Sequence, residues 1–309
     1  MKFHDAQTLA KHLDWKSLID AQRHMYDLPC EVPPRPHYEL GAATGEAGTA
    51  LIMPAWNSRY FGVKTVLVTP GNRARGLSAL HSTYILSCRE TGEPLAAFDG
   101  NVITSRRTAA ASALGADFLA RKDARNLLLV GAGRVGSLVP QAHRQVREIS
   151  AVRVWDIDPA QSRRLVTELR DEGFDAEVAR SIEAELAWAD VVSTATLACA
   201  PIVAGAWLKA GTHVDLIGSF TPRMREADDE VMRRGQVFVD TYIALTESGD
   251  LVQPLASFMT ESAIRGSLQQ LCTGSTRGRD NADEITVFKA VGHALADLVT
   301  AVAAYQRLC

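Results

Sequence analysis

Short apolar runs alternate with helical stretches through the middle of the chain. The runs of strand length lie at 127–130, 152–155, 176–179, 190–194, 213–217 and 236–239. Strands that alternate with helices build a mostly parallel sheet covered on both faces. The pattern therefore predicts an α/β fold here, with ligands bound beyond the carboxyl ends of the strands.

The pattern differs on both sides of this region. The elements predicted before it are a helix at about 6–20, a proline-rich segment at 32–36, strands that contain 51–54, 61–68 and 84–87, and an alanine-rich helix that opens at Ser105. Several strands ahead of that helix indicate a separate mixed sheet. After the region, apolar residues at helical spacing predict one long helix at 285–308 that runs back onto the first domain.

The most specific motif is a glycine loop between the first predicted strand of the α/β region and a predicted helix at 134–148. Its residues are Gly131, Ala132, Gly133, Arg134, Val135 and Gly136. The first glycine of such a loop permits a tight turn, the second lets the backbone approach a pyrophosphate, and the third packs the helix on the strand. Backbone amides and the partial positive charge at the helix start then hold the anion.

An acidic residue, Asp156, ends the next predicted strand about twenty positions after the last glycine, as a dinucleotide fingerprint requires. Its carboxylate can accept hydrogen bonds from the adenosine ribose and would repel a 2′-phosphate. The cofactor is therefore expected to be NAD(H) rather than NADP(H). Arg163 and Arg164, on the following helix, keep NADP(H) possible.

Small polar residues follow two more predicted strands, at 193–196 and 217–220. Their place at strand ends puts Thr194, Thr196 and Gly218 along the expected cofactor groove. Ordinary loop chemistry is the alternative interpretation of these small residues.

Composition and charge exclude several classes of function. The net charge of −3, with mixed signs over 309 residues, gives no electrostatic footprint for nucleic acid or an anionic membrane. There is no apolar run of spanning length and no signal peptide, so a cytoplasmic protein is expected. The scattered cysteines lack metal-ligand spacing and are expected to be reduced thiols; they are Cys30, Cys88, Cys199, Cys272 and Cys309.

Three basic residues of the first domain have apolar or small neighbours: Arg35, Lys64 and Arg107. Arginine binds a carboxylate through a planar, two-pronged donor set, and a desolvated lysine carries a transferable proton. Composition alone does not choose between Arg107 and its neighbour Arg106, and Lys64 could equally be a solvent-facing strand residue.

Several blocks, in order along nearly the whole chain, together resemble the ornithine cyclodeaminase and mu-crystallin family. These blocks are Val32-Pro-Pro-Arg35, Leu51-Ile-Met-Pro-Ala-Trp56, Gly62-Val-Lys64, Pro70-Gly-Asn72, Arg107-Thr-Ala-Ala110, the glycine loop, Gly218-Ser-Phe-Thr-Pro222, Arg225-Glu226 and Ile285-Thr-Val-Phe-Lys289. The resemblance implies a Rossmann-type NAD(P) domain at 119–289. It also implies a mixed-sheet domain, at 1–118 and 290–309, for substrate binding and homodimer formation, with a substrate cleft between the two.

The resemblance also implies roles for single residues. Arg35 and Arg107, rather than Arg106, would bind the carboxylate of a small amino or imino acid. Lys64 would lie beside the reacting carbon and assist proton transfer. Thr196 and Phe288 would lie near the nicotinamide. Apart from the resemblance, His81 is a candidate for a proton relay, and a structural role is the favoured interpretation of this histidine.

The chain departs from the ornithine cyclodeaminase pattern at two positions where acidic residues would contact the ornithine nitrogens. These positions are Leu51 and Phe220, and neither side chain can accept a proton or a hydrogen bond from an ammonium group. The chain is more similar to the ketimine reductase branch, so the leading hypothesis is NAD(P)H-dependent reduction of Δ1-pyrroline-2-carboxylate or its six-membered homologue.

Two other functions stay open. An ornithine cyclodeaminase would need a replacement acid, for which Glu46, Asp99 and Asp215 are candidates. The second is a non-catalytic, crystallin-like NAD(P)-binding protein. The presence of Arg35, Lys64 and Arg107 argues against this function.

Overall fold

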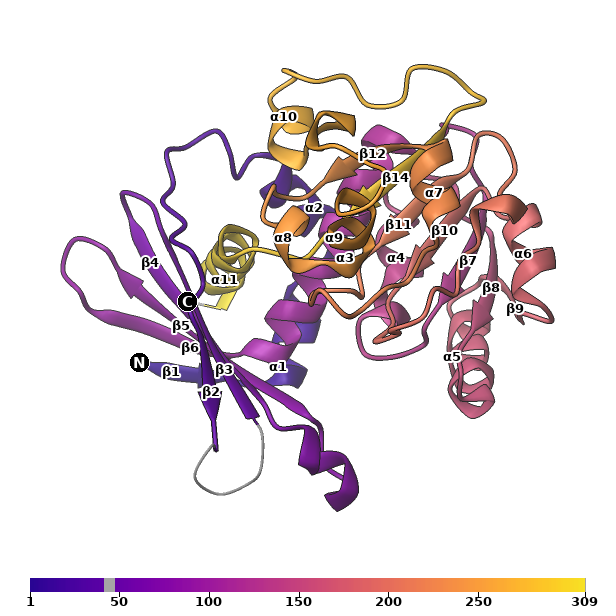
Figure 1. Ribbon diagram of the computed structural model, residues 1–309. Helices are drawn as coiled ribbons and strands as arrows, with labels where there is room; N and C mark the ends of the chain where they lie inside the picture. Colours follow the sequence, from indigo (N-terminus) through magenta and orange to yellow (C-terminus); the bar gives the residue numbers. More distant parts are fainter. Residues whose placement is uncertain (42–47, 309) are drawn as a thin grey trace. The chain divides into compact units, whose positions relative to one another are not determined.

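The computed structural model describes residues 1–41 and 48–308, apart from the side chain of Arg73. The chain divides into two compact units, one made of residues 1–107 and 293–309 and the other of residues 108–292 (Figure 1). The first division falls within helix α3, Gly100–Leu119. The fold is α/β, as predicted, with a mixed sheet in the first unit and a parallel sheet in the second.

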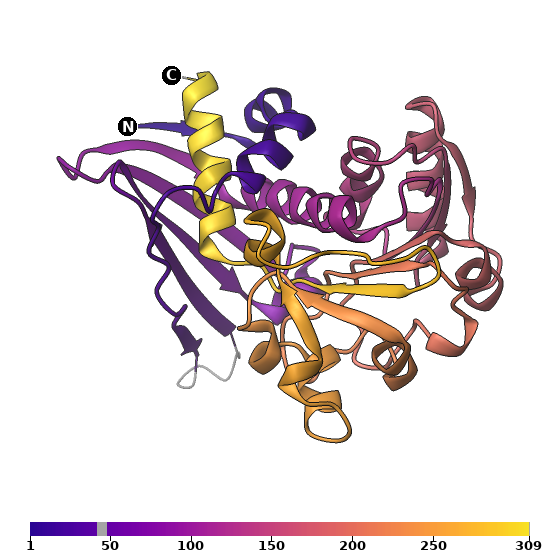
Figure 2. The same ribbon diagram turned by 90° about the horizontal axis from the view of Figure 1, so that it is seen from above.

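The sheet of the first unit has six strands in the order β1-β6-β5-β4-β3-β2. Their bounds are β1 Lys2–His4, β2 His37–Leu40, β3 Gly48–Trp56, β4 Tyr60–Val68, β5 Leu80–Cys88 and β6 Pro94–Asp99. Strands β2 to β6 pair antiparallel, and β1 joins β6 in parallel. Helix α11, Ala294–Leu308, packs against β3, β4 and β5 and against α2, Trp15–Arg23 (Figure 2).

The single helix predicted at 6–20 is wrong, because the chain forms two. Helix α1, Ala6–His12, ends before Asp14, whose carboxylate accepts a hydrogen bond from the amide of Ser17 and starts α2. An N-terminal aspartate satisfies helix amides that have no partner within the helix, and it is unfavourable in a helix interior. Helix α3 likewise begins earlier than Ser105, because Asp99 caps it by accepting from the amides of Asn101 and Val102.

The sheet of the second unit has eight parallel strands in the order β13-β12-β14-β11-β10-β7-β8-β9. Their bounds are β7 Asn126–Val130, β8 Ala151–Trp155, β9 Asp175–Val178, β10 Val191–Thr194, β11 His213–Leu216, β12 Gly235–Val239, β13 Ile264–Ser267 and β14 Ile285–Lys289. The six strands predicted from the apolar runs are confirmed. The strand order reverses between β7 and β10, which is where ligands bind in doubly wound sheets.

The long helix predicted at 285–308 is wrong in its first part. Residues 285–289 form β14, a strand whose residues are all buried between β11 and β12. A short apolar run fits a buried strand and a buried helix equally well, so periodicity does not separate them. Gly292, with φ of 74°, lies between this strand and α11.

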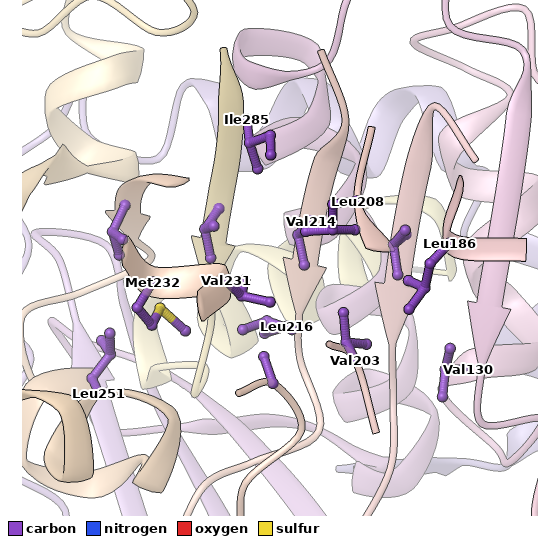
Figure 3. Packing of buried hydrophobic residues seen from close by; sticks show 14 of the residues in the cluster. Val130, Leu186, Val203, Leu208, Val214, Leu216, Val231, Met232, Leu251 and Ile285 are labelled. Atoms are coloured by element: carbon purple, nitrogen blue, oxygen red, sulfur yellow. The ribbon is translucent and has the colours of Figure 1, made fainter. Parts of the chain in front are cut away.

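The core of the second unit covers both faces of its sheet. Leu128 and Val130 pack on one face and Leu127 and Leu129 on the other. Figure 3 shows the first face, where residues of the central strands meet Val231 and Met232 of helix α7, Asp229–Arg234. The other helices of this unit are α4 Val139–His143, α5 Pro159–Asp171, α6 Ile182–Trp188, α8 Ala244–Glu247, α9 Gly249–Leu255 and α10 Leu268–Cys272. Among the helices described, none is both long enough and apolar enough to span a bilayer.

Candidate functional sites

The glycine loop leaves the carboxyl end of β7. Gly131 has φ of 102°, and a Cβ there would lie 2.8 Å from the carbonyl oxygen of Ala195 in the loop after β10. A Cβ on Gly136 would collide with the carbonyl of Gly131, whereas one on Gly133 would meet nothing within 4 Å. The first and last glycines are therefore required by the fold, and the space beside Gly133 lets a ligand approach the backbone.

The helix predicted at 134–148 is wrong in length. A 3₁₀ turn at Gly136–Leu138 leads into the five-residue helix α4, with Pro140 in its first turn. Proline has no amide hydrogen, so it can begin a helix but does not continue one from a preceding turn. The turn that follows the glycine loop therefore begins only at Gly136. Gly133 and Arg134 lie before this turn and are exposed.

Asp156 follows β8 and is tied to the glycine loop. Its Oδ2 accepts a hydrogen bond from the amide of Ala132 at 2.7 Å, and its Oδ1 accepts one from the amide of Asp158 at 2.9 Å. The carboxylate is half-buried beside the loop, which is the position expected of the ribose-binding acid. Arg163 and Arg164 are exposed on α5, and Arg164 pairs with Glu168 at 3.5 Å.

The loops after β10 and β11 meet at a buried carboxylate, Glu226. Its Oε1 accepts hydrogen bonds from the amide and the hydroxyl of Thr196, at 2.8 Å and 2.9 Å. Its Oε2 accepts from the amides of Gly218 and Ser219, at 2.7 Å and 3.1 Å. Thr194 lies at the end of β10, fully buried, and its hydroxyl has no hydrogen-bond partner in the described part of the chain.

A second carboxylate and a lysine complete this network. Lys289, at the end of β14, lies 3.2 Å from Oδ2 of Asp250 and 3.9 Å from Oε2 of Glu226, and all three are buried. Burial raises the pKa of Glu226 to about 7, and Lys289 and the amide donors oppose that increase. Phe288, the neighbour of Lys289, is a core residue whose ring packs on Gly115 of α3.

In the first unit, Lys64 and Arg107 meet at another buried carboxylate, Asp297 of α11. Lys64 Nζ donates to Oδ2 at 2.6 Å, and Arg107 Nε donates to Oδ1 at 3.0 Å. The side chains of Lys64, Arg107 and Asp297 are 2%, 8% and 0% exposed. Lys64 lies in the middle of β4, opposite Met53 on β3 and Tyr84 on β5. The tight strand pairing therefore fixes its backbone from both sides.

This cluster shifts the pKa values of its members. Burial, together with the nearby Arg107 and Arg35 guanidinium groups, lowers the pKa of Lys64 to about 8 against the opposing effect of Asp297. Burial alone would raise the pKa of Asp297, but the Lys64 and Arg107 cations outweigh it and lower that pKa. Burial, and then Asp297, raise the pKa of the Tyr84 phenol, so Tyr84 stays a neutral hydroxyl.

Arg106 and Arg107 have different partners in the structure. Arg106 donates to the carbonyls of Ala10 and Leu13 and stacks over Trp15, so it binds the end of α1. Arg35, half-buried in the segment before β2, is close enough to Lys64 to lower its pKa. Lys64 and Arg107 therefore meet at Asp297, and Arg35 acts on Lys64 through its charge.

A family model matches residues 14–309 and is described as the ornithine cyclodeaminase/mu-crystallin family. The chain belongs to this family. A Δ1-pyrroline-2-carboxylate reductase of Paracoccus denitrificans is 39% identical over 94% of this chain and 91% of its own. The Thermococcus litoralis enzyme of that name, solved with NADH and L-proline, matches with a TM-score of 0.94 and 31% identity, over 99% of this chain and 97% of its own. An archaeal alanine dehydrogenase dimer with bound NAD matches with a TM-score of 0.91 and 27% identity, over 99% and 95%.

The positions where the resemblance leads us to expect acids in a cyclodeaminase are Leu51 and Phe220. Leu51 lies on the face of β3 that carries Met53, the partner of Lys64, and Phe220 is 38% exposed in the loop after β11. Of the replacement acids considered, Asp99 caps α3 and Asp215 is fully buried, where its Oδ2 accepts from the hydroxyls of Ser112 and Ser193. Glu46 lies outside the described residues.

His81 is exposed on β5, where it pairs with Leu67, and it faces away from the side of the sheet that carries Tyr84 and Lys64. It is therefore not placed to relay a proton to Lys64.

Sequence reasoning missed Asp297 and the roles of Glu226 and Lys289. Asp297 lies within the apolar stretch Ala294-Leu-Ala-Asp-Leu298. Aspartate is almost never fully buried without a partner, so an acid on the apolar face of a helix was the available signal for a buried pair. No local pattern indicates which cations Asp297 meets.

Proposed function

We propose that this protein reduces a small cyclic imino acid, Δ1-pyrroline-2-carboxylate or its six-membered homologue, to the cyclic L-amino acid with a reduced nicotinamide cofactor. The observation that carries the proposal is the buried cluster of Lys64, Arg107 and Asp297, with two cations on one carboxylate. The reductases among the relatives act on substrates of this kind by name.

The charge of the cluster suits a monocarboxylate. Among the described residues, the two cations and one anion of the cluster leave a net charge of about +1 in a buried site. A buried charge is costly unless it is paired, so the carboxylate of the substrate would complete the balance. Arg107 binds Asp297 only through Nε, and its two terminal amino groups have no hydrogen-bond partner among the described residues. We propose that these groups, with Arg35, hold the substrate carboxylate.

Lys64 is suited to keep the imine protonated. With a pKa of about 8 it carries its proton at neutral pH, and burial makes that proton easier to transfer than that of an exposed lysine. A protonated imine carbon accepts hydride more readily than a neutral one. When bound, the reduced nicotinamide supplies that hydride, and the chain supplies orientation and the proton.

The parallel sheet of the second unit fits a dinucleotide. The space beside Gly133 lets a pyrophosphate approach the backbone, and Asp156 lies at the end of the neighbouring strand β8. We propose Gly131 to Gly136, Asp156, Thr194, Thr196, Gly218 and Phe288 as the cofactor-binding set, with Phe288 and Thr194 supporting it from the core. The Asp156 carboxylate favours NAD(H), and NADP(H) stays possible.

We further propose a homodimer formed through the first unit. The sheet face opposite Lys64 carries a row of apolar residues paired across neighbouring strands: Phe3, Ala97, Ile85, Val63 and Pro54. Phe3 is 58% and Ile85 is 43% exposed, and exposed apolar patches of this kind mark interfaces. The related alanine dehydrogenase is a dimer by name.

The decisive experiment follows the absorbance of NADH and of NADPH with purified protein and Δ1-pyrroline-2-carboxylate. A parallel assay with ornithine and catalytic NAD measures released ammonia. Consumption of reduced cofactor without ammonia from ornithine would support the proposal. Ammonia and proline from ornithine would instead establish a cyclodeaminase, and cofactor binding with no turnover in either assay would leave a binding protein.

A further inference from the structure

Glu226 accepts hydrogen bonds from four donors on two separate loops. Two belong to Thr196, after β10, and two are the amides of Gly218 and Ser219, after β11. A carboxylate can accept about four hydrogen bonds, so both oxygens are fully used inside the protein. A fully buried acid with this arrangement is a clamp between loops, since neither oxygen has capacity left for a ligand.

The residues behind Glu226 hold it in place. Asp250 Oδ1 accepts from the amides of Glu226 and Ala227, at 2.7 Å and 3.1 Å, and so fixes the backbone that carries the acid. Lys289 lies between the two carboxylates and offsets their charge. The clamp is thus anchored by Asp250 of α9 and Lys289 of β14, whose side chains are buried.

The clamped loops lie where the cofactor is proposed to bind. Strand β10 is the neighbour of β7 across the reversal of strand order, and the loop after β10 touches the glycine loop, because a Cβ on Gly131 would lie 2.8 Å from the oxygen of Ala195. We propose that Glu226 is a positioning residue for the nicotinamide cofactor, which fixes Thr196 and Gly218 at the ends of β10 and β11. This inference rests on the proposed function, because it presumes that the cofactor binds at these strand ends.

Replacing Glu226 with glutamine tests the clamp with almost no change in shape. In one orientation the new NH₂ group faces the two amides of Gly218 and Ser219. In the other it faces the amide of Thr196, whose hydroxyl can turn and accept from it. Two donors cannot bond to each other, so one loop must move away. We expect Glu226→Gln to raise the Kd for NADH about tenfold or more, since each tenfold is about 1.4 kcal/mol and at least one backbone amide loses its acceptor.

The chain offers a matched control at the other end of the same strands. Asp190, directly before β10, also accepts two amides, those of Arg125 and Asn126, at 3.0 Å and 3.1 Å. It is 6% exposed, and it also pairs with Arg121 and Lys209. Asp190→Asn disturbs hydrogen bonds from backbone amides to a buried carboxylate, as Glu226→Gln does, but at the amino ends of β7 and β10, away from the proposed cofactor site. Both variants are expected to lower Tm, but Asp190→Asn should leave the Kd for NADH within about twofold.

The experiment measures NADH binding by fluorescence and the KM for NADH and for the imino acid, with Tm as the record of folding. We expect Glu226→Gln to raise the KM for NADH while the KM for the imino acid changes within about twofold. If Glu226→Gln does not fold, Glu226→Asp replaces it; the carboxylate is kept but too short to reach both loops, and an intermediate rise in Kd is expected. A Kd in the folded Glu226 variant that matches Asp190→Asn would overturn the inference. Failure of the native protein to bind either NADH or NADPH would instead sink the proposed function.

Discussion

The replacement of Asp297 by asparagine should move the alkaline limb of the activity profile. The profile of kcat/KM reports the pKa values of essential groups in the unliganded enzyme. If Lys64 must be protonated, activity falls as the pH rises through its pKa of about 8. Asp297 favours the protonated lysine, so removing its charge lowers the pKa of Lys64. The limb should therefore move to lower pH.

The size of this movement follows from the separation of the charges. Lys64 Nζ lies 2.6 Å from Oδ2 of Asp297, and both groups are buried. Two unit charges about 4 Å apart, the scale of the separation between charge centres, interact by about 4 kcal/mol at an effective dielectric constant of about 20. Since about 1.4 kcal/mol corresponds to one pH unit, the full effect is about 3 pH units. Rearrangement around the neutral amide reduces it, so the limb should move by about 1 to 3 pH units.

The assay measures kcat/KM for the imino acid between about pH 4 and about pH 10 in the native protein, Asp297→Asn and Thr300→Val. Thr300 is buried on the same helix, and its hydroxyl has no partner among the described residues, so its loss removes a polar group without removing charge. Its profile should stay unchanged. If the alkaline limb instead reports the titration of the substrate imine, it would lie at the same pH in all three proteins. That result, with Asp297→Asn folded by its Tm and circular dichroism, would refute the role given to Lys64.

Three further predictions concern the separate parts of the proposal. Lys64→Met should reduce turnover by about 10² to 10⁴ while the Kd for NADH stays within about twofold, and parallel loss of NADH binding would show a structural lysine. Asp156→Asn, which removes the charge that repels a 2′-phosphate, should raise the ratio of kcat/KM for NADPH to that for NADH about tenfold; an unchanged ratio would contradict the assignment. Ile85→Lys should give a monomer by light scattering, whereas Val178→Lys, at an exposed strand residue of the second unit, should not.

The parts that the sequence predicted correctly are those that depend on local pattern. The glycine loop and Asp156 are set by spacing within one β-α-β unit, and in the fold the Asp156 carboxylate accepts from the amide of Ala132 in that loop. The run at 285–289 was misread as helix because its register against β11 and β12 decides the structure, and that pairing is not local. The two carboxylates that organise the sites could not be assigned for the same reason. Asp297 and Lys64 are 233 positions apart, so only the folded chain brings them together.

The absence of an acid at Leu51 and at Phe220 favours an imino acid over a diamino acid as the substrate. Ornithine carries an ammonium group that a cyclic imine lacks, and a desolvated ammonium without a carboxylate partner costs several kcal/mol. Asp297 cannot neutralise a further ammonium group, because its single negative charge already faces the two cations Lys64 and Arg107. Leu51, on the Lys64 face of the sheet, is paired with Val66 and His37 and brings only apolar surface. A monocarboxylate with a ring nitrogen therefore balances the charge of this cluster, whereas an additional cation would raise it further.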